Sequence, residues 1–174
     1  MNTNRKANQL WYDMIKRCSD VVYKRHHTTY NECLCSENFS NISYFKEWCS
    51  TQIGFGSKGW TLDKDILVKG NKVYSEDTCY FVPQEINKLF VKRGVRKQYP
   101  LGVNYHTLSG KYRSSISYNG KHKYLGLYLT PEEAFQAYKQ AKEDYIKEVA
   151  NKWKDQIDPK VYEALMCWEI SADD

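Results

Sequence analysis

The feature that most constrains the fold is the dipeptide Asn119-Gly120, which separates two stretches of alternating apolar and polar residues. Asn-Gly is the strongest short hairpin signal, because both residues of the tight turn must accept positive φ. The stretches 111–118 and 121–129 are therefore predicted to pair as antiparallel strands, and 102–106 is a candidate third strand.

A helix is predicted directly after this sheet. Thr130 and Glu133 form a capping box, and Pro131 occupies the first helical position. The helix is expected to run to about Trp153, with a stripe that would cover the sheet and comprises Ala134, Ala137, Tyr138, Ala141 and Tyr145. The predicted fold class is α+β, with a three-stranded antiparallel sheet packed on one helix.

One face of such a sheet stays bare. Because side chains alternate along a strand, Ser114 and Ile116 are expected to face the helix and Leu125 to pack inward. The outward side chains suit base edges and phosphates, and they are Arg113, Ser115, Ser117, His122 and Tyr124. Three lysines near the turns would neutralise phosphates, namely Lys111, Lys121 and Lys123. The alternative is a small protein-interaction sheet.

Charge is distributed unevenly along the chain. Residues 86–131 contain nine Lys and Arg and no acidic residue, whereas 1–85 carry a net charge of +1 and 132–174 a net charge of −5. A basic block interleaved with Tyr and Gly indicates a nucleic-acid site. The alternative is a solvated basic face.

Residues 102–142, "GVNYHTLSGKYRSSISYNGKHKYLGLYLTPEEAFQAYKQAK", resemble the DNA-binding domain of the plant ethylene-response factors (APETALA-type). The match lies in the Gly-Val opening, Tyr112, Ile116, the Tyr124-Leu125-Gly126 stretch, Tyr128 and the T-x-E-E-A helix start. The resemblance implies that the sheet enters the major groove of double-stranded DNA and that its outer side chains make the contacts.

The N-terminal half predicts short helices and strands around an aromatic core. A helix is expected over 8–19, a long loop over 19–37, a helix over 43–52, strands over 60–67 and 79–82, and a helix from 83 to 90. A last helix is expected from Asp158 to about Trp168. The predicted core aromatics are Trp11, Phe45, Trp48 and Phe81.

The first half of the chain resembles phage HNH (His-Me finger) endonucleases of the homing type, from Trp11 and Arg17-Cys18 through Trp48. The resemblance is strongest over residues 62–87, "LDKDILVKGNKVYSEDTCYFVPQEIN". The resemblance implies a ββα-metal unit that hydrolyses phosphodiester bonds with Mg²⁺ or another divalent cation. Asp63 then falls on the acid position and Asn87 on the helical ligand position, so these two would hold the metal. Lys64 falls where the base histidine belongs, and Thr78 takes the place of the middle Asn.

Lysine is a poor general base, because it is protonated at neutral pH. Lys64 could act instead as a fixed cation on the scissile phosphate. Two further options stay open: His26 or His27 reaches the site, or Asp63 and Asp65 both bind the metal. In a purely structural interpretation, the two aspartates cap the following loop and Asn87 is an ordinary polar helix residue.

These resemblances predict an HNH-like nuclease unit over 1–92, a basic linker over 93–101, an ethylene-response-factor-type domain over 102–153, and a C-terminal helix with an acidic tail over 154–174. The predicted function is a double-stranded DNA endonuclease, or a degenerate form of one, because Lys64 replaces the base histidine. One alternative is a non-catalytic DNA-binding regulator. Another is a phage inhibitor that binds a host defence protein through its acidic C-terminal part.

Cellular location follows from two absences in the sequence. There is no apolar run of about 20 residues, and the first residues lack the apolar stretch of a signal peptide. The prediction is a protein of the host cytoplasm with no membrane partner. Its cysteines should then be reduced, and Cys33, Cys35, Cys49 and Cys79 are predicted to be buried thiols rather than ligands of a structural zinc.

Overall fold

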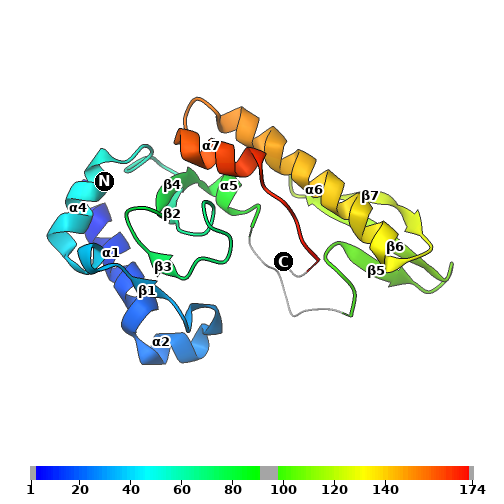
Figure 1. Ribbon diagram of the computed structural model, residues 1–174, viewed down its shortest axis with the longest axis horizontal. Helices are drawn as coiled ribbons and strands as arrows, with labels where there is room; N and C mark the ends of the chain where they lie inside the picture. Colours follow the sequence, from blue (N-terminus) through cyan, green and yellow to red (C-terminus); the bar gives the residue numbers. More distant parts are fainter. Residues whose placement is uncertain (1–2, 91–97, 173–174) are drawn as a thin grey trace. The chain divides into compact units, whose positions relative to one another are not determined.

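The computed structural model describes residues 3–90 and 98–172 (Figure 1). The chain divides into two compact units: unit 1 comprises Met1–Lys88 and Trp153–Ala164, and unit 2 comprises Leu89–Lys152 and Leu165–Asp174. Helices and antiparallel strands occur in the described residues, which confirms the mixed α+β class. The predicted basic linker overlaps 91–97, which lie outside the described residues.

Unit 1 is built on helices α1 (Thr3–Ser19), α3 (Glu37–Ser40) and α4 (Ile42–Thr51). Their apolar faces meet in one core with the buried residues Met14, Cys33, Phe39, Phe45, Cys49, Tyr74, Cys79 and Phe81. Trp11 and Trp48 pack against this core, and the Trp11 Nε1 donates to the Phe39 carbonyl at 2.9 Å. The predicted core aromatics are therefore confirmed.

The expected loop over 19–37 is wrong in part, because it contains helix α2 (Val21–His26), a 3₁₀ turn at Thr28–Tyr30 and strand β1 (Leu34–Cys35). The Asp20 carboxylate caps α2 by accepting from the Tyr23 N–H at 2.9 Å. The stretch was predicted to be a loop because it is polar, but one of its polar residues, Asp20, is an N-cap, and an N-cap stabilises even a short helix.

Unit 1 also contains two strand pairs. Strand β1 pairs in parallel with β3 (Val73–Tyr74), and β2 (Trp60–Asp63) pairs antiparallel with β4 (Tyr80–Pro83), placing Asp63 opposite Tyr80. Helix α5 (Gln84–Asn87) follows β4 and contacts both strands of the second pair.

Two predicted elements of unit 1 are shorter than expected. Strand β2 ends at Asp63, because the side chain of this residue binds the next backbone N–H groups and turns the chain away from the ladder. Helix α5 ends at Asn87 rather than Phe90, so it comprises a single turn.

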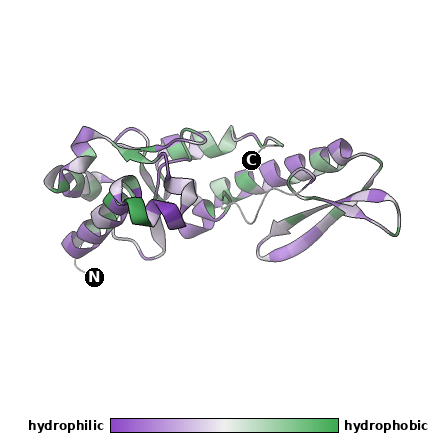
Figure 2. Cartoon of the chain, turned by 90° about the horizontal axis from the view of Figure 1, so that it is seen from below, coloured by the Kyte–Doolittle hydropathy of each residue, from purple (hydrophilic) through white to green (hydrophobic). Residues whose placement is uncertain are grey.

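Unit 2 contains a three-stranded antiparallel sheet in the order β5 (Val103–His106), β6 (Lys111–Tyr118), β7 (Lys121–Tyr128). Asn119 and Gly120 join the last two strands with φ of 49° and 74°, which confirms the predicted turn. Figure 2 shows both hydrophilic and hydrophobic stretches along these strands, as expected for a sheet with one covered and one open face.

Helix α6 (Pro131–Trp153) runs along this sheet in Figure 1. The capping box is confirmed: the Glu133 N–H donates to Thr130 Oγ1 at 3.2 Å, and Glu133 Oε2 accepts from the Thr130 N–H at 3.3 Å. The helix approaches the sheet closely at Gly102, where an added Cβ would lie 2.0 Å from the Tyr138 ring. Glycine is therefore required at this position.

The last helix is α7 (Pro159–Met166), slightly shorter than the predicted 158–168. Every helix in the described part of the chain is too short or too polar to cross a membrane.

Candidate nucleic-acid interface

The two faces of the β5–β6–β7 sheet differ sharply in exposure. Ser114 and Ile116 lie on the side of α6 and are 0% and 3% exposed. Ser115 pairs with Tyr124, and Ser117 pairs with His122, so these four side chains share the opposite face. Arg113, Ser117, His122 and Tyr124 are exposed there, and Ser115 is half-buried. The predicted division of the side chains is confirmed, whereas their role in DNA binding stays a prediction.

A β-bulge changes this division beyond Tyr124. Ser114 pairs with Gly126 and Ser115 with Tyr124, which leaves Leu125 as the extra residue of β7. Gly126 takes φ of 144°, which glycine adopts without strain. The bulge turns Leu127 onto the outer face opposite Arg113, where it is 38% exposed. Simple alternation from Tyr124 would have placed Leu127 under α6.

Two more outer-face residues come from β5. Asn104 pairs with Arg113, and His106 pairs with Lys111. The ring of His106 is held by a 2.8 Å hydrogen bond between Nδ1 and Ser109 Oγ. Neither residue was among the predicted contacts. Val103 is an apolar residue that packs inward, so alternation along β5 would have placed Asn104 and His106 on the outer face. We call the set Asn104, His106, Lys111, Arg113, Ser115, Ser117, His122, Tyr124 and Leu127 the outer face.

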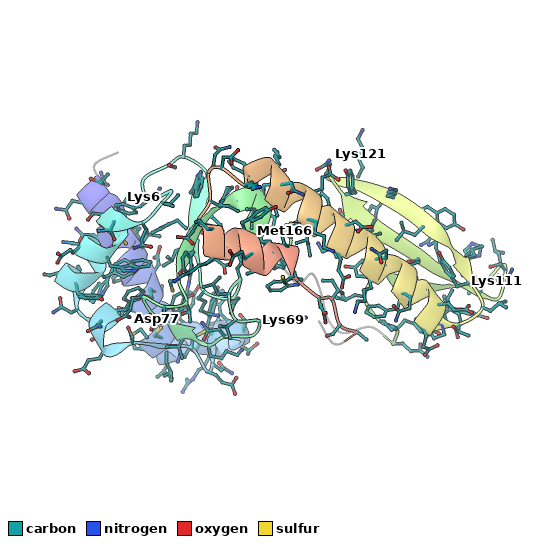
Figure 3. All side chains as sticks on the ribbon, turned by 45° about the horizontal axis from the view of Figure 1, so that its top comes forward. Lys6, Lys69, Asp77, Lys111, Lys121 and Met166 are labelled. Carbon is teal, nitrogen blue, oxygen red and sulfur yellow. The ribbon has the colours of Figure 1, made fainter. Side chains whose placement is uncertain are left out.

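The three predicted phosphate-binding lysines do not lie together. Lys111 begins β6 and Lys121 begins β7, so they mark opposite ends of the sheet in Figure 3. Lys123 pairs with Ile116 and therefore lies on the side of α6, where its Nζ is 5.7 Å from the centroid of the Tyr118 ring. The sheet separates Lys123 from Arg113, so Lys123 is not part of the outer face.

Helix α6 anchors the hairpin tip that carries Lys121 and His122. The Tyr118 hydroxyl donates to the Glu148 carboxylate at 2.6 Å, a bond that raises the pKa of Tyr118. The Tyr145 hydroxyl accepts from the Asn119 N–H at 3.3 Å and donates to Asn119 Oδ1 at 3.1 Å. These bonds fix the turn relative to the helix.

The acidic residues predicted for catalysis lie where β2 ends, in unit 1. Asp63 Oδ1 accepts from the N–H groups of Asp65 at 2.8 Å and Ile66 at 3.0 Å. Lys64 is only 8% exposed, and its Nζ donates to Asp65 Oδ1 at 2.6 Å and to the Asn71 carbonyl at 2.5 Å. Asp63 thus caps the loop, and the Lys64 ammonium is already neutralised.

Asn71 holds the loop between β2 and β3 in place. Its Nδ2 donates to the carbonyls of Lys64 at 2.8 Å and Val73 at 2.7 Å, while its Oδ1 accepts from the Val73 N–H at 3.0 Å. Thr78, which the HNH resemblance puts at the place of the middle Asn, also contacts this loop: its hydroxyl donates to the Val73 carbonyl at 3.0 Å and lies 2.9 Å from Ser75 Oγ. Both residues stabilise this loop, and Asn71 makes three of the hydrogen bonds within it. The Gly70-Asn71 dipeptide was the sequence signal for this turn.

The remaining predicted catalytic groups are separate. Asn87 ends α5 and is half-buried. His26 and His27 lie at the end of α2, and no hydrogen bond or ion pair among the described residues joins either of them to Asp63 or Lys64.

The donor set around Asp63 does not fit a divalent cation. One oxygen of Asp63 already accepts two N–H groups, and Asp65 Oδ1 is paired with the Lys64 ammonium at 2.6 Å. Within residues 3–90 and 98–172, no three His, Cys, Asp or Glu side chains are arranged to hold a metal ion.

The predicted cysteine set is divided between two environments. Cys33, Cys49 and Cys79 are buried, and burial raises the pKa of Cys49 and of Cys79 to about 12. Cys35 is half-buried, and the pKa of the Cys18 thiol is raised to about 12 by burial and by its neighbours Cys35 and Cys33. Thiols with such pKa values are protonated at neutral pH and pack as small apolar groups.

Comparison with known proteins gave no match to any family model, curated protein or solved structure. The resemblances to the ethylene-response-factor domain and to the HNH endonucleases therefore stay predictions.

One prediction concerns the effect of the Asp63 carboxylate on the thermal stability of the protein at neutral pH. Burial raises the pKa of Asp63, so the folded state binds this proton more tightly than the unfolded state does. The resulting stability is present at acidic pH and is lost as the pH rises through the raised pKa. Asp63→Asn keeps an oxygen for both N–H donors and should therefore raise Tm at pH 7, with a gain that shrinks as the pH falls.

The matched control for this measurement is Asp20→Asn. Asparagine caps a helix as well as aspartate does, so Tm of this variant should change little at either pH. Thermal unfolding of both variants beside the wild type checks the prediction. A lower Tm for Asp63→Asn at pH 7 would show that the ionised carboxylate stabilises the fold.

Proposed function

We propose that this protein binds double-stranded DNA through the outer face of the β5–β6–β7 sheet. The observation that carries the proposal is the arrangement of hydrogen-bonding side chains in register on one open face. No acidic residue occurs in the three strands, so the face is free of groups that would repel phosphates. A sheet of this size can enter the major groove, where each base pair presents a distinct pattern of donors, acceptors and methyl groups.

The individual side chains supply complementary chemistry. The Arg113 guanidinium lies near the middle of the face and can donate two parallel hydrogen bonds to a guanine edge or a phosphate. Ser115, Ser117 and His122 offer both donors and acceptors. Tyr124 is 60% exposed and presents a ring and a hydroxyl to the partner.

One end of the outer face would contact the DNA backbone. Lys111 is exposed where β6 begins, so it can approach a phosphate beside the groove that the central residues enter. Lys121 pairs with Tyr118 and therefore lies on the side of α6. Contacts of this kind release counterions, and affinity should therefore fall with rising salt concentration. Lys123 is excluded from these contacts by its position on the side of α6.

The matched pair Arg113→Gln and Lys123→Gln tests this proposal. Both changes remove one positive charge from unit 2, but only the first alters the outer face. Arg113→Gln should weaken binding to a labelled duplex by roughly 1–3 kcal/mol, about 5- to 150-fold. Lys123→Gln should leave affinity near the wild-type value in fluorescence anisotropy over a series of salt concentrations. Equal losses for the two variants would indicate general charge attraction without a defined face.

A second candidate function is metal-dependent cleavage of DNA, and one observation favours it. Asp63 ends β2, the helix α5 contacts both strands of the pair, and burial raises the pKa of the Asp63 carboxyl. Perturbed pKa values cluster at functional sites, so the raised pKa of Asp63 supports this candidate. Against this candidate stand the occupied oxygen of Asp63 and the ion pair of Lys64.

Supercoiled plasmid with Mg²⁺ or Mn²⁺ separates the two candidates. Because the donor set does not fit a divalent cation, we expect neither the wild type nor Asp63→Asn to yield nicked or linear DNA above a metal-free control. Metal-dependent product from the wild type that disappears in the folded Asp63→Asn variant would establish the second candidate. The anisotropy measurement is independent of this outcome.

A further inference from the structure

Leu127 differs from every other side chain of the outer face. The remaining outer-face residues of β5, β6 and β7 are polar, charged or aromatic, whereas Leu127 is aliphatic and 38% exposed. It reaches this face only because the bulge inserts Leu125 between the pairs Ser114–Gly126 and Ser115–Tyr124. Without the extra residue, Leu127 would point toward α6, where an aliphatic side chain belongs.

Leu127 lies in the same cross-strand row as Arg113. It pairs directly with Arg113, which in turn pairs with Asn104 on the other side, so the three residues form one row across the sheet. Directly opposed side chains in antiparallel strands lie about 4.5–5.5 Å apart. Leu127 is therefore the cross-strand neighbour of the arginine that the proposed function places at base edges.

Only one group in the major groove is apolar, and it is the C5-methyl group of thymine. A leucine at a base edge can bury that methyl group, while it leaves the acceptors and donors of other bases without a partner. The row thus combines an aliphatic contact with the polar contacts of Arg113.

We propose that Leu127 is a specificity-determining residue that contacts a thymine methyl group next to the base or phosphate bound by Arg113. This inference rests on the proposed DNA binding by the outer face. It adds a substrate class: duplexes that carry thymine at one defined position of the bound site.

The experiment uses duplexes enriched from a randomised library by the full-length wild-type protein. Each thymine of the best-bound duplex is replaced in turn by deoxyuridine, which removes the methyl group and preserves the base pair. At one position the replacement should weaken wild-type binding about fourfold, since a buried methyl-sized group contributes roughly 0.8 kcal/mol.

Two variants show whether the effect passes through Leu127. Leu127→Ser should bind the thymine and deoxyuridine duplexes equally. Leu129→Ser is the matched control, because Leu129 is also an exposed leucine but lies just beyond the end of β7. This control should retain the fourfold difference. Both positions are exposed, so neither change removes a core contact.

The outcomes separate this inference from the function on which it rests. If no thymine replacement alters wild-type affinity while Arg113→Gln still weakens binding, the inference is wrong and the DNA-binding proposal stands. The same conclusion follows if Leu127→Ser keeps the full sensitivity to deoxyuridine. If no duplex is enriched and Arg113→Gln has no effect, both proposals are overturned.

Discussion

The interaction on which the rest of unit 2 depends is the packing of α6 on one face of the β5–β6–β7 sheet. Ile116 and Ser114 are buried on that side, Gly102 admits the Tyr138 ring, and Tyr145 holds the hairpin turn at Asn119. Because a helix covers only one face, every second side chain of the strands is left toward solvent. The rigid backing also fixes the spacing of those exposed side chains, which is a requirement for recognition of a rigid partner such as duplex DNA.

The charged groups at the end of β2 and those on the outer face differ in their partners. At the end of β2, Asp63, Lys64 and Asp65 bind one another or the backbone, and Asn71 closes the loop around them. Those charges are satisfied within the protein. On the outer face, Arg113 and Lys111 are exposed, and the strands supply no acidic partner. Charges that the fold leaves open are the ones available to an external anion, so the proposed function lies in unit 2.

Short sequence motifs were enough to predict much of unit 2. Asn119-Gly120 predicted the hairpin, Thr130 and Glu133 predicted the helix start, and alternation predicted the outward row from Arg113 to Tyr124. The position of Leu127 could not be predicted, because a single inserted residue in β7 reverses the alternation of side chains. Gly126, with φ of 144°, is the one residue near the bulge whose type hints at it. Lys123 was assigned by its closeness to a turn, although alternation with His122 already placed it on the covered side. Asn71 and the ion pair of Lys64 depend on a loop conformation that no sequence period encodes.

The most direct test of the account is histidine footprinting with diethyl pyrocarbonate, read by mass spectrometry with and without a bound DNA duplex. The chain has four histidines: His106 and His122 lie on the outer face, and His26 and His27 lie at the end of α2 in unit 1. The account predicts that DNA protects His106 and His122 from modification and leaves His26 and His27 as reactive as before. Protection of His26 and His27 alone, or unchanged reactivity of all four histidines under conditions where the duplex is bound, would contradict it.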